Sequence, residues 1–273
     1  MNRATLLCLS ALLATGWAAA EPELKEVRTK HYTVRSDLKG QELRELQHFL
    51  EAMFKSYSKT FKGEPLREGY APQVRVFREQ ADYTAFGQSD SGVRFNANWR
   101  GYFSRSRTEL VSYRGETLAD LFAILSHEGL HQFMWGYGVP PEAEDFPDWF
   151  EEGLGEWFRT GRTRGSTLIQ STLTYHVERV RRAIDEGWVW TLDQILECDP
   201  AKLEDPDRFN AFYAHAYLLM DLLCAREPAV VRQIYLQKKA GKTNAEIMAE
   251  VLGTPEKKER LYQAFLQHVK TKK

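Results

Sequence analysis

The sequence of 273 residues predicts an α+β protein with a small mixed sheet in its first half and a mainly helical second half. Short strand-like segments occur only before residue 115, and long runs with helical spacing of apolar residues follow residue 116. No repeat or long linker interrupts the chain. We therefore expect one domain over residues 21–273, with its sheet at about 21–115 and its helices at about 116–273.

Residues 1–20 have the pattern of a secretory signal peptide. Arg3 precedes an apolar run, and the small residues Ala18 and Ala20 stand where a signal peptidase cleaves. An uncleaved anchor is the alternative, but the run is short for a membrane-spanning helix. We expect an exported protein, periplasmic or extracellular, that begins near Glu21.

The first half alternates strand and helix signals. His31–Arg35 has the composition of a strand, and Gln73–Phe77 alternates polar and apolar residues. Between them, Gly40–Phe61 carries apolar residues at helical spacing. We expect a hairpin next, formed by Gly101–Ser104 and Glu109–Tyr113.

The second half is expected to be helical. Thr117 and Asp120 resemble an N-cap pair for a helix that runs towards Gly136, and Pro147 is suited to the first turn of the next helix. Further helices are expected over Leu168–Ile184, Asp207–Cys224, Pro228–Lys238, Asn244–Leu252 and Glu256–Lys270.

Charge and hydropathy bear on whether the protein binds nucleic acid or a membrane. The chain has 37 basic and 38 acidic residues, which gives no electrostatic reason to expect nucleic acid as a partner. After the first 20 residues no segment is apolar enough to span a bilayer, so stable membrane insertion is not expected after cleavage.

Cys198 and Cys224 remain in the mature chain, as a disulfide or as two free thiols. The oligomeric state does not follow from the sequence.

Residues 127–131 read H-E-G-L-H, a match to H-E-x-x-H. On a helix, His127 and His131 lie on one face and can present two imidazole nitrogens to one metal ion. Glu128 is placed to act on a water molecule at such a metal. Met134 and Tyr137 occupy the positions where metzincins carry Gly and His, so that class is excluded.

A second motif, W-x-x-E-G-x-x-E, begins at Trp149. HExxH followed by this motif resembles the gluzincin metallopeptidases, and most of all the bacterial peptidase-MA-like families. The resemblance implies a thermolysin-like zincin core with Zn²⁺ as cofactor and Glu152 as the third zinc ligand. The motifs cover residues 127–156, and a looser likeness extends over about 30–225.

Glu151 competes with Glu152 for the role of third ligand, because the spacing from the second histidine varies among gluzincins. The W-x-x-E-G register favours Glu152. Glu156 lies one helical turn later on the same face. The resemblance implies that Glu156 accepts a hydrogen bond from the ring N–H of His127 and fixes its tautomer.

The resemblance also implies a Tyr or His that donates to the oxyanion of the transition state. Tyr213, His215 and Tyr217 are the candidates, and Tyr213 fits best. In this fold an edge strand beside the zinc helix pairs with extended substrate. Glu109–Tyr113, just before the zinc helix, is expected to be that strand.

The remaining aromatic and basic residues are expected to be structural. Trp135, Trp149 and Trp157 are assigned to the core, and Arg159–Arg164 to the solvated surface. Four histidines stand in no cluster with the spacing of metal ligands: His31, His48, His176 and His268.

We therefore expect a secreted or periplasmic zinc-dependent metallopeptidase that hydrolyses a peptide or protein substrate with a water activated by Glu128. A catalytically inactive, zinc-stabilised binding or scaffold protein of the same fold is the alternative. A helical interaction protein with a coincidental motif is the third possibility, and it predicts no bound metal.

Overall fold

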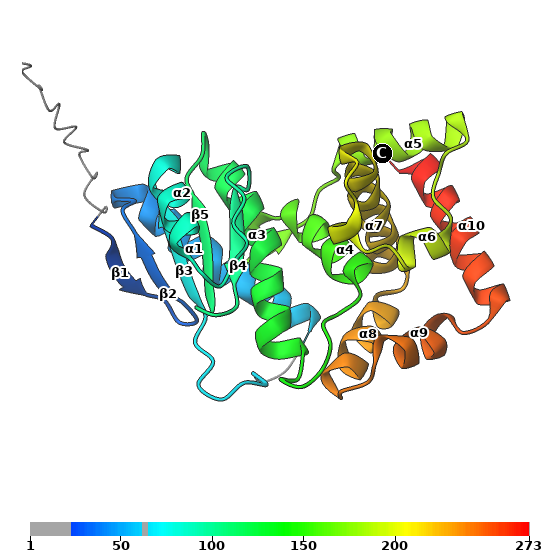
Figure 1. Cartoon of the computed structure of the whole chain (residues 1–273), viewed down its shortest axis with the longest axis horizontal. Coiled ribbons are helices and arrows are strands. Elements are labelled where there is room, and N and C mark those ends of the chain that lie inside the picture. The colour runs from blue at the N-terminus through cyan, green and yellow to red at the C-terminus, as the bar shows by residue number, and fades with distance from the viewer. Residues whose placement is uncertain (1–22, 62–64, 273) are drawn as a thin grey trace, which may run out of the picture.

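The computed structural model describes residues 23–61 and 65–272, so the expected signal peptide lies outside the described residues. The prediction of an α+β protein, with a small mixed sheet first and helices second, is confirmed. The sheet lies at one end of the molecule and most helices of the second half lie at the other, with two helices of the motif region between them (Figure 1).

The sheet contains five strands: β1 (Lys25–Arg28), β2 (Thr33–Ser36), β3 (Gln73–Phe77), β4 (Gly101–Ser104) and β5 (Glu109–Tyr113). Their order is β1-β2-β3-β5-β4, with β2, β3 and β5 parallel and the outer strands β1 and β4 antiparallel to their neighbours. The register aligns Val34, Val74 and Leu110, which are fully buried.

The expectation that Glu109–Tyr113 forms the edge strand is wrong. β5 lies between β3 and β4, and β4 is the last strand at this end of the sheet. The burial of β5 reflects this position, because the residues from Glu109 to Ser112 are all buried. Among residues 23–61 and 65–272, the edge strand of the sheet on this side is therefore β4.

Helices cover both faces of the sheet. α1 (Gly40–Thr60) and α3 (Leu118–Phe133) belong to the large core cluster that includes Val34 and Leu110. α2 (Gln80–Ser89), which the sequence analysis did not identify, packs with Tyr83 in a second cluster on the other face. Its signal is weak because only Tyr83 and Gly87 of its ten residues are buried.

The second half is helical apart from one short hairpin. Its helices are α4 (Asp148–Arg159), α5 (Thr174–Glu186), α6 (Leu192–Leu196), α7 (Pro206–Arg226), α8 (Pro228–Lys239), α9 (Asn244–Leu252) and α10 (Pro255–Thr271). The hairpin consists of β6 (Arg162–Arg164) and β7 (Thr167–Ile169). A short π-helix, η1 (Met134–Gly138), follows α3 directly, and a short 3-10 helix, η2 (Pro200–Lys202), precedes α7.

The prediction of a helix from Leu168 was wrong at its start, since α5 begins at Thr174. Gly165, with φ of +60°, forms the turn between β6 and β7. The backbone N–H of Leu168 then donates to Ser56 Oγ at 2.7 Å, which attaches β7 to α1. This contact spans more than a hundred residues of sequence, so local periodicity does not reveal it.

α4 and α7 are in close contact at Gly153, where the absence of a side chain lets the two helices approach each other. A Cβ on Gly153 would lie 2.6 Å from the carbonyl oxygen of Ala216, so only glycine permits this approach. The contact sets the face of α7 that carries Tyr213 against the glutamates of α4. Trp149, as expected, is buried in the core, whereas Trp135 and Trp157 are only partly buried.

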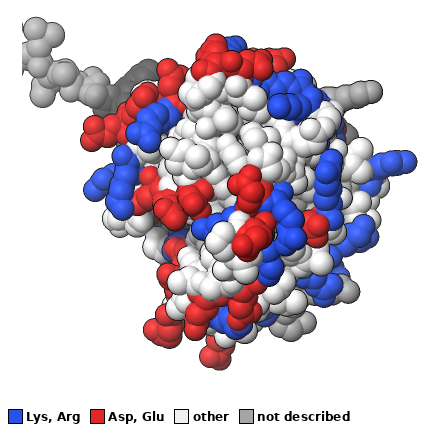
Figure 2. Space-filling model, turned by 90° about the vertical axis from the view of Figure 1, so that its right-hand side faces the viewer, with Lys and Arg blue, Asp and Glu red and all other residues white. Residues whose placement is uncertain are grey.

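Cys198 and Cys224 are free thiols in this structure. Within residues 23–61 and 65–272, no helix combines the length and apolar character needed to cross a bilayer. At the helical end of the molecule, acidic and basic side chains are interspersed around an uncharged area (Figure 2).

Candidate active site

α3 carries the first motif on the side that faces α4. The Thr117 hydroxyl accepts from the N–H of Asp120 at 3.1 Å, which confirms the expected N-cap. At the other side of the helix, the Tyr57 hydroxyl donates to the Ser126 carbonyl oxygen at 2.6 Å and fixes α3 on α1. His127 and His131, one turn apart, then project towards α4 with their ring centroids 5.1 Å apart.

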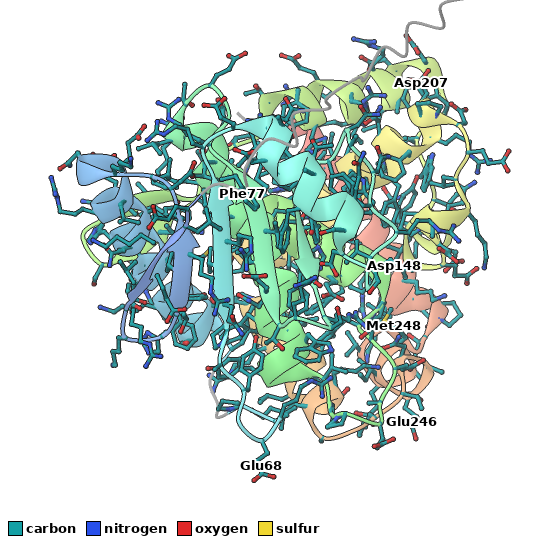
Figure 3. The ribbon with its side chains drawn as sticks, turned by 60° about the vertical axis from the view of Figure 1, so that its left-hand side comes forward. Glu68, Phe77, Asp148, Asp207, Glu246 and Met248 are labelled. Carbon is teal, nitrogen blue, oxygen red and sulfur yellow. The ribbon has the colours of Figure 1, made fainter. Side chains whose placement is uncertain are left out.

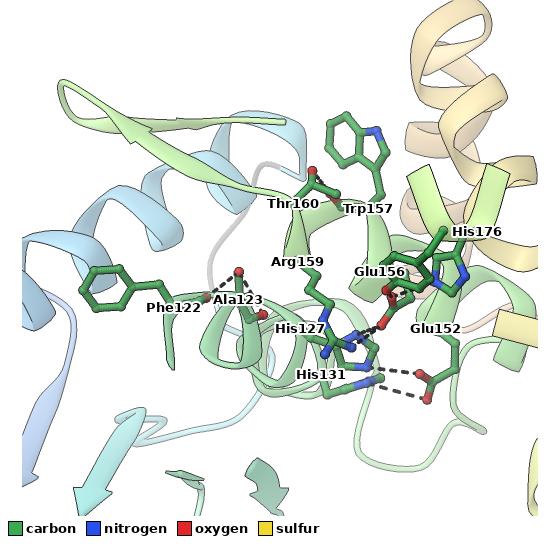
Figure 4. A network of polar contacts seen from close by, with 12 residues as sticks. Phe122, Ala123, His127, His131, Glu152, Glu156, Trp157, Arg159, Thr160 and His176 are labelled. Atoms are coloured by element: carbon green, nitrogen blue, oxygen red, sulfur yellow. Dashed lines mark hydrogen bonds and ion pairs between the residues drawn. The ribbon is translucent and has the colours of Figure 1, made fainter. Parts of the chain in front are cut away.

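Three side chains from two helices converge at this point (Figure 4). Glu152 Oε2 lies 3.2 Å from His127 Nε2, and Glu152 Oε1 lies 3.7 Å from His131 Nε2. One ligand atom from each of the three residues lies within 4.8 Å of the other two. This is the spacing of a group that can hold one metal ion, and the sequence analysis had selected all three residues.

Each imidazole also meets a second carboxylate through Nδ1. His127 Nδ1 lies 3.1 Å from Glu156 Oε1, an ion-pair contact whose angle does not reach that of a hydrogen bond. His131 Nδ1 lies 2.9 Å from Glu151 Oε1 within hydrogen-bond geometry. The competing glutamates thus take different positions, because Glu152 faces both Nε2 atoms and Glu151 faces the far side of one ring.

The electrostatic environment favours positive charge between these rings. Burial alone would lower the pKa of His131, but the carboxylates of Glu152 and Glu151 outweigh it and raise that pKa to about 9. The pKa of His127 is likewise raised well above its usual value by Glu152 and Glu156, against the effect of burial. Asp148, at the start of α4 between the sheet and the helical half (Figure 3), adds a further carboxylate to the cleft.

Glu156 is held by more donors than the resemblance implied. Arg159 Nη1 donates to Glu156 Oε1 at 2.9 Å, and His176 Nε2 donates to Glu156 Oε2 at 3.0 Å. The Tyr175 hydroxyl lies 3.4 Å from Glu156 Oε2. Figure 4 shows Arg159 and His176 approaching this carboxylate from different helices. Burial would raise the pKa of Glu156, but the contacts with His127, His176 and Arg159 hold it well below its usual value.

Two expectations are therefore corrected. Arg159 is only partly exposed and is paired with Glu156, whereas Arg162 and Arg164 are exposed as expected. The position of Arg159 three residues after Glu156 was a usable signal, since such residues share a helix face. His176 is not isolated, because α5 packs on α7, the helix on which α4 also packs, and this brings its ring to Glu156. Of the other histidines, His31 pairs with Glu51 and His268 with Asp221.

His127, His131 and Glu152 lie in a cleft of about 930 Å³ between the sheet and the helical half. The edge strand β4 contributes Gly101, Tyr102 and Phe103 to the lining. Glu128, next to His127, also lines the cleft, and burial raises the pKa of its carboxyl group.

Only one of the three expected oxyanion donors lines this cleft. Tyr213 does, and burial together with the carboxylates of Glu152 and Glu128 raises the pKa of its hydroxyl. His215 is fully buried and accepts from the backbone N–H of Trp190 at 3.2 Å, and burial lowers its pKa to about 4. The Tyr217 hydroxyl accepts from the backbone N–H of Leu173 at 3.0 Å. His215 and Tyr217 are structural.

The arrangement defines the class of the site as an HExxH helix whose two histidines face a glutamate, Glu152, on a neighbouring helix. Residues 121–241 are similar to a family described as Protein of unknown function (DUF1570). The matched part begins within α3 and extends just beyond α8, so it contains both motifs and Tyr213, while the sheet lies outside it. A comparison with curated proteins finds no match.

Gly155 lets α4 approach the histidine helix. A Cβ at this position would lie 2.8 Å from His127 Cε1 and 2.9 Å from Nδ1. In an open helix a Gly-to-Ala change stabilises by about 1 kcal/mol. We expect Gly155→Ala instead to displace the imidazole and weaken metal binding about tenfold or more, as measured by zinc competition with a chromophoric chelator. Unchanged affinity with increased stability would contradict this geometry.

Proposed function

We propose that the protein is a zinc-dependent metallopeptidase. The observation that carries this proposal is the convergence of His127, His131 and Glu152 within 4.8 Å, in a cleft that Glu128 also lines. Two imidazoles and one carboxylate are a ligand set of catalytic zinc sites, which leave further positions for water and substrate. We also propose export by the signal segment, which places the activity in the periplasm or outside the cell.

The residues present fit zinc chemically. Glu152 Oε2 is buried and has no hydrogen-bond partner among the described residues, and a metal ion would satisfy it. The carboxylates of Glu151 and Glu156 face the Nδ1 atoms and leave both Nε2 atoms directed at Glu152. This pattern is typical of zinc-binding histidines, whose other ring nitrogen donates to a carboxylate.

The chain's own residues supply the other steps of peptide hydrolysis. A bound zinc ion would polarise the scissile carbonyl group and lower the pKa of the water molecule bound to it. The carboxylate of Glu128 accepts the proton of the attacking water and returns it to the leaving amine. The Tyr213 hydroxyl, whose raised pKa keeps it protonated, donates to the oxyanion that develops in the transition state. The outer edge of β4 pairs with no other strand of the described residues, and it offers backbone groups to an extended substrate.

The direct test is hydrolysis of a fluorogenic peptide library by the purified, zinc-reconstituted protein. Cleavage that stops with a chelator and returns with zinc supports the proposal. A zinc-loaded protein that cleaves no peptide or protein would favour the inactive scaffold, the other function compatible with the same metal group.

His176 provides a test of how Glu156 is held. We expect His176→Leu to lower zinc affinity by about tenfold, because the carboxylate that orients His127 loses one of its donors. His176→Gln, which keeps an N–H donor at a similar reach, is the matched control and should retain most of the affinity. Equal affinity of wild type and both variants, measured by chelator competition, would show that His176 does not act through Glu156.

A further inference from the structure

Exposed aromatic side chains are concentrated at the cleft. Six large apolar side chains of the described residues are exposed, and three of them line the cleft: Trp99 at 41%, Tyr175 at 51% and Phe209 at 39%. Large aromatic surface left in water at a concave site marks a place where a ligand is bound. Ile169, Trp188 and Leu236, the other three, are not among the residues that line this cleft.

The three aromatic residues come from opposite sides of the cleft. Trp99 lies two residues before β4, on the side of the sheet, and contacts Phe95 edge-on. Tyr175 is on α5 and Phe209 is on α7, both in the helical half, and Phe209 packs against Tyr213 with ring centroids 4.8 Å apart. The two halves are on either side of α3 and α4 in Figure 1, so a bound molecule meets apolar surface on both sides.

An extended peptide is the occupant that fits these walls. β4 is at the end of the sheet order, and its residues Gly101 to Phe103 line the same cleft as Trp99. A peptide added along this edge is held by its backbone and projects successive side chains to opposite sides. Such a peptide would lie between Trp99 on the side of the sheet and Tyr175 and Phe209 on the helical side.

We propose that the substrate is an extended peptide segment with bulky apolar or aromatic side chains on both sides of the scissile bond, bound by Trp99, Tyr175 and Phe209. This inference rests on the proposed peptidase function and names its substrate class. Burial of the three rings by such side chains removes apolar surface from water on both partners, whereas short or charged side chains leave the rings exposed.

The test compares Trp99→Ala and Phe209→Ala with Trp188→Ala, a matched exposed tryptophan at 40% that follows α5 outside the cleft. Peptides with Phe or Leu flanking the cleaved bond are compared with otherwise identical peptides carrying Ala or Lys. We expect the zinc-loaded wild type to prefer the apolar peptides. The two cleft variants should lose about tenfold in kcat/KM for them, mainly through KM. Trp188→Ala should match wild type.

A binding measurement separates this inference from the proposed function. Fluorescence anisotropy with a labelled apolar peptide and its Ala-substituted analogue applies whether or not the protein cleaves them. Zinc-dependent cleavage without a preference for apolar side chains overturns the inference and leaves the peptidase function standing. Absence of cleavage together with selective binding that Trp99→Ala weakens overturns the peptidase function and keeps the peptide class. Equal binding of both peptides overturns the inference.

Discussion

Glu128→Gln is expected to abolish peptide hydrolysis while zinc binding and folding stay almost unchanged. Glutamine keeps the shape of the side chain in the cleft but does not accept the proton of water. Loss of a positioned general base costs about 10²- to 10⁴-fold in rate. The measurement is kcat/KM for a fluorogenic peptide, beside zinc content and the unfolding temperature of the same samples.

Glu178→Gln serves as the control, because Glu178 is an exposed carboxylate of α5 that does not line the cleft. It should behave as wild type in all three measurements. Full activity of Glu128→Gln would remove Glu128 from the proposed mechanism. Loss of zinc or of folding in this variant would instead make it a structural residue.

Glu152→Gln is expected to eliminate the stabilisation that zinc confers on the fold. A ligand present at a thousand times its Kd stabilises the native state by about 4 kcal/mol. For a domain of this size, that corresponds to an increase of roughly 10 °C in the unfolding temperature. Zinc should therefore raise the unfolding temperature of wild type and leave that of Glu152→Gln almost unchanged.

Glu151→Gln is the matched control for this variant, since the two glutamates are adjacent and take different positions. Glu151 pairs with Nδ1 of His131 and not with an Nε2 atom of the described histidines, so its loss should weaken zinc binding about tenfold without removing it. A larger loss of zinc-dependent stabilisation from Glu151→Gln than from Glu152→Gln would reverse the assignment of the third ligand.

Local sequence patterns were sufficient for the elements that contain the site. The two-residue periodicity gave the bounds of β3, and the N-cap at Thr117 gave the start of α3. The i, i+4 spacing of His127 and His131 follows directly from helix geometry. The register of the second motif selected Glu152, and the structure places both of its carboxylate oxygens towards Nε2 atoms.

Features that depend on tertiary contacts were missed or misplaced. The order of β4 and β5 in the sheet depends on which strand pairs with β3, and the hairpin sequence is the same in either case. His176 reaches Glu156 only because α4 and α5 both pack on α7. The prediction that a helix starts at Leu168 was wrong, because a few apolar residues do not by themselves distinguish a short strand from the first turn of a helix.

Metal content tests the central claim most directly. Elemental mass spectrometry of the purified protein after zinc reconstitution and dialysis should find about one zinc per wild-type chain, and almost none in His131→Ala. His48→Ala, which changes an exposed histidine of α1, should retain the wild-type content. A folded wild-type protein that holds no zinc would contradict the metal site and, with it, the proposed peptidase.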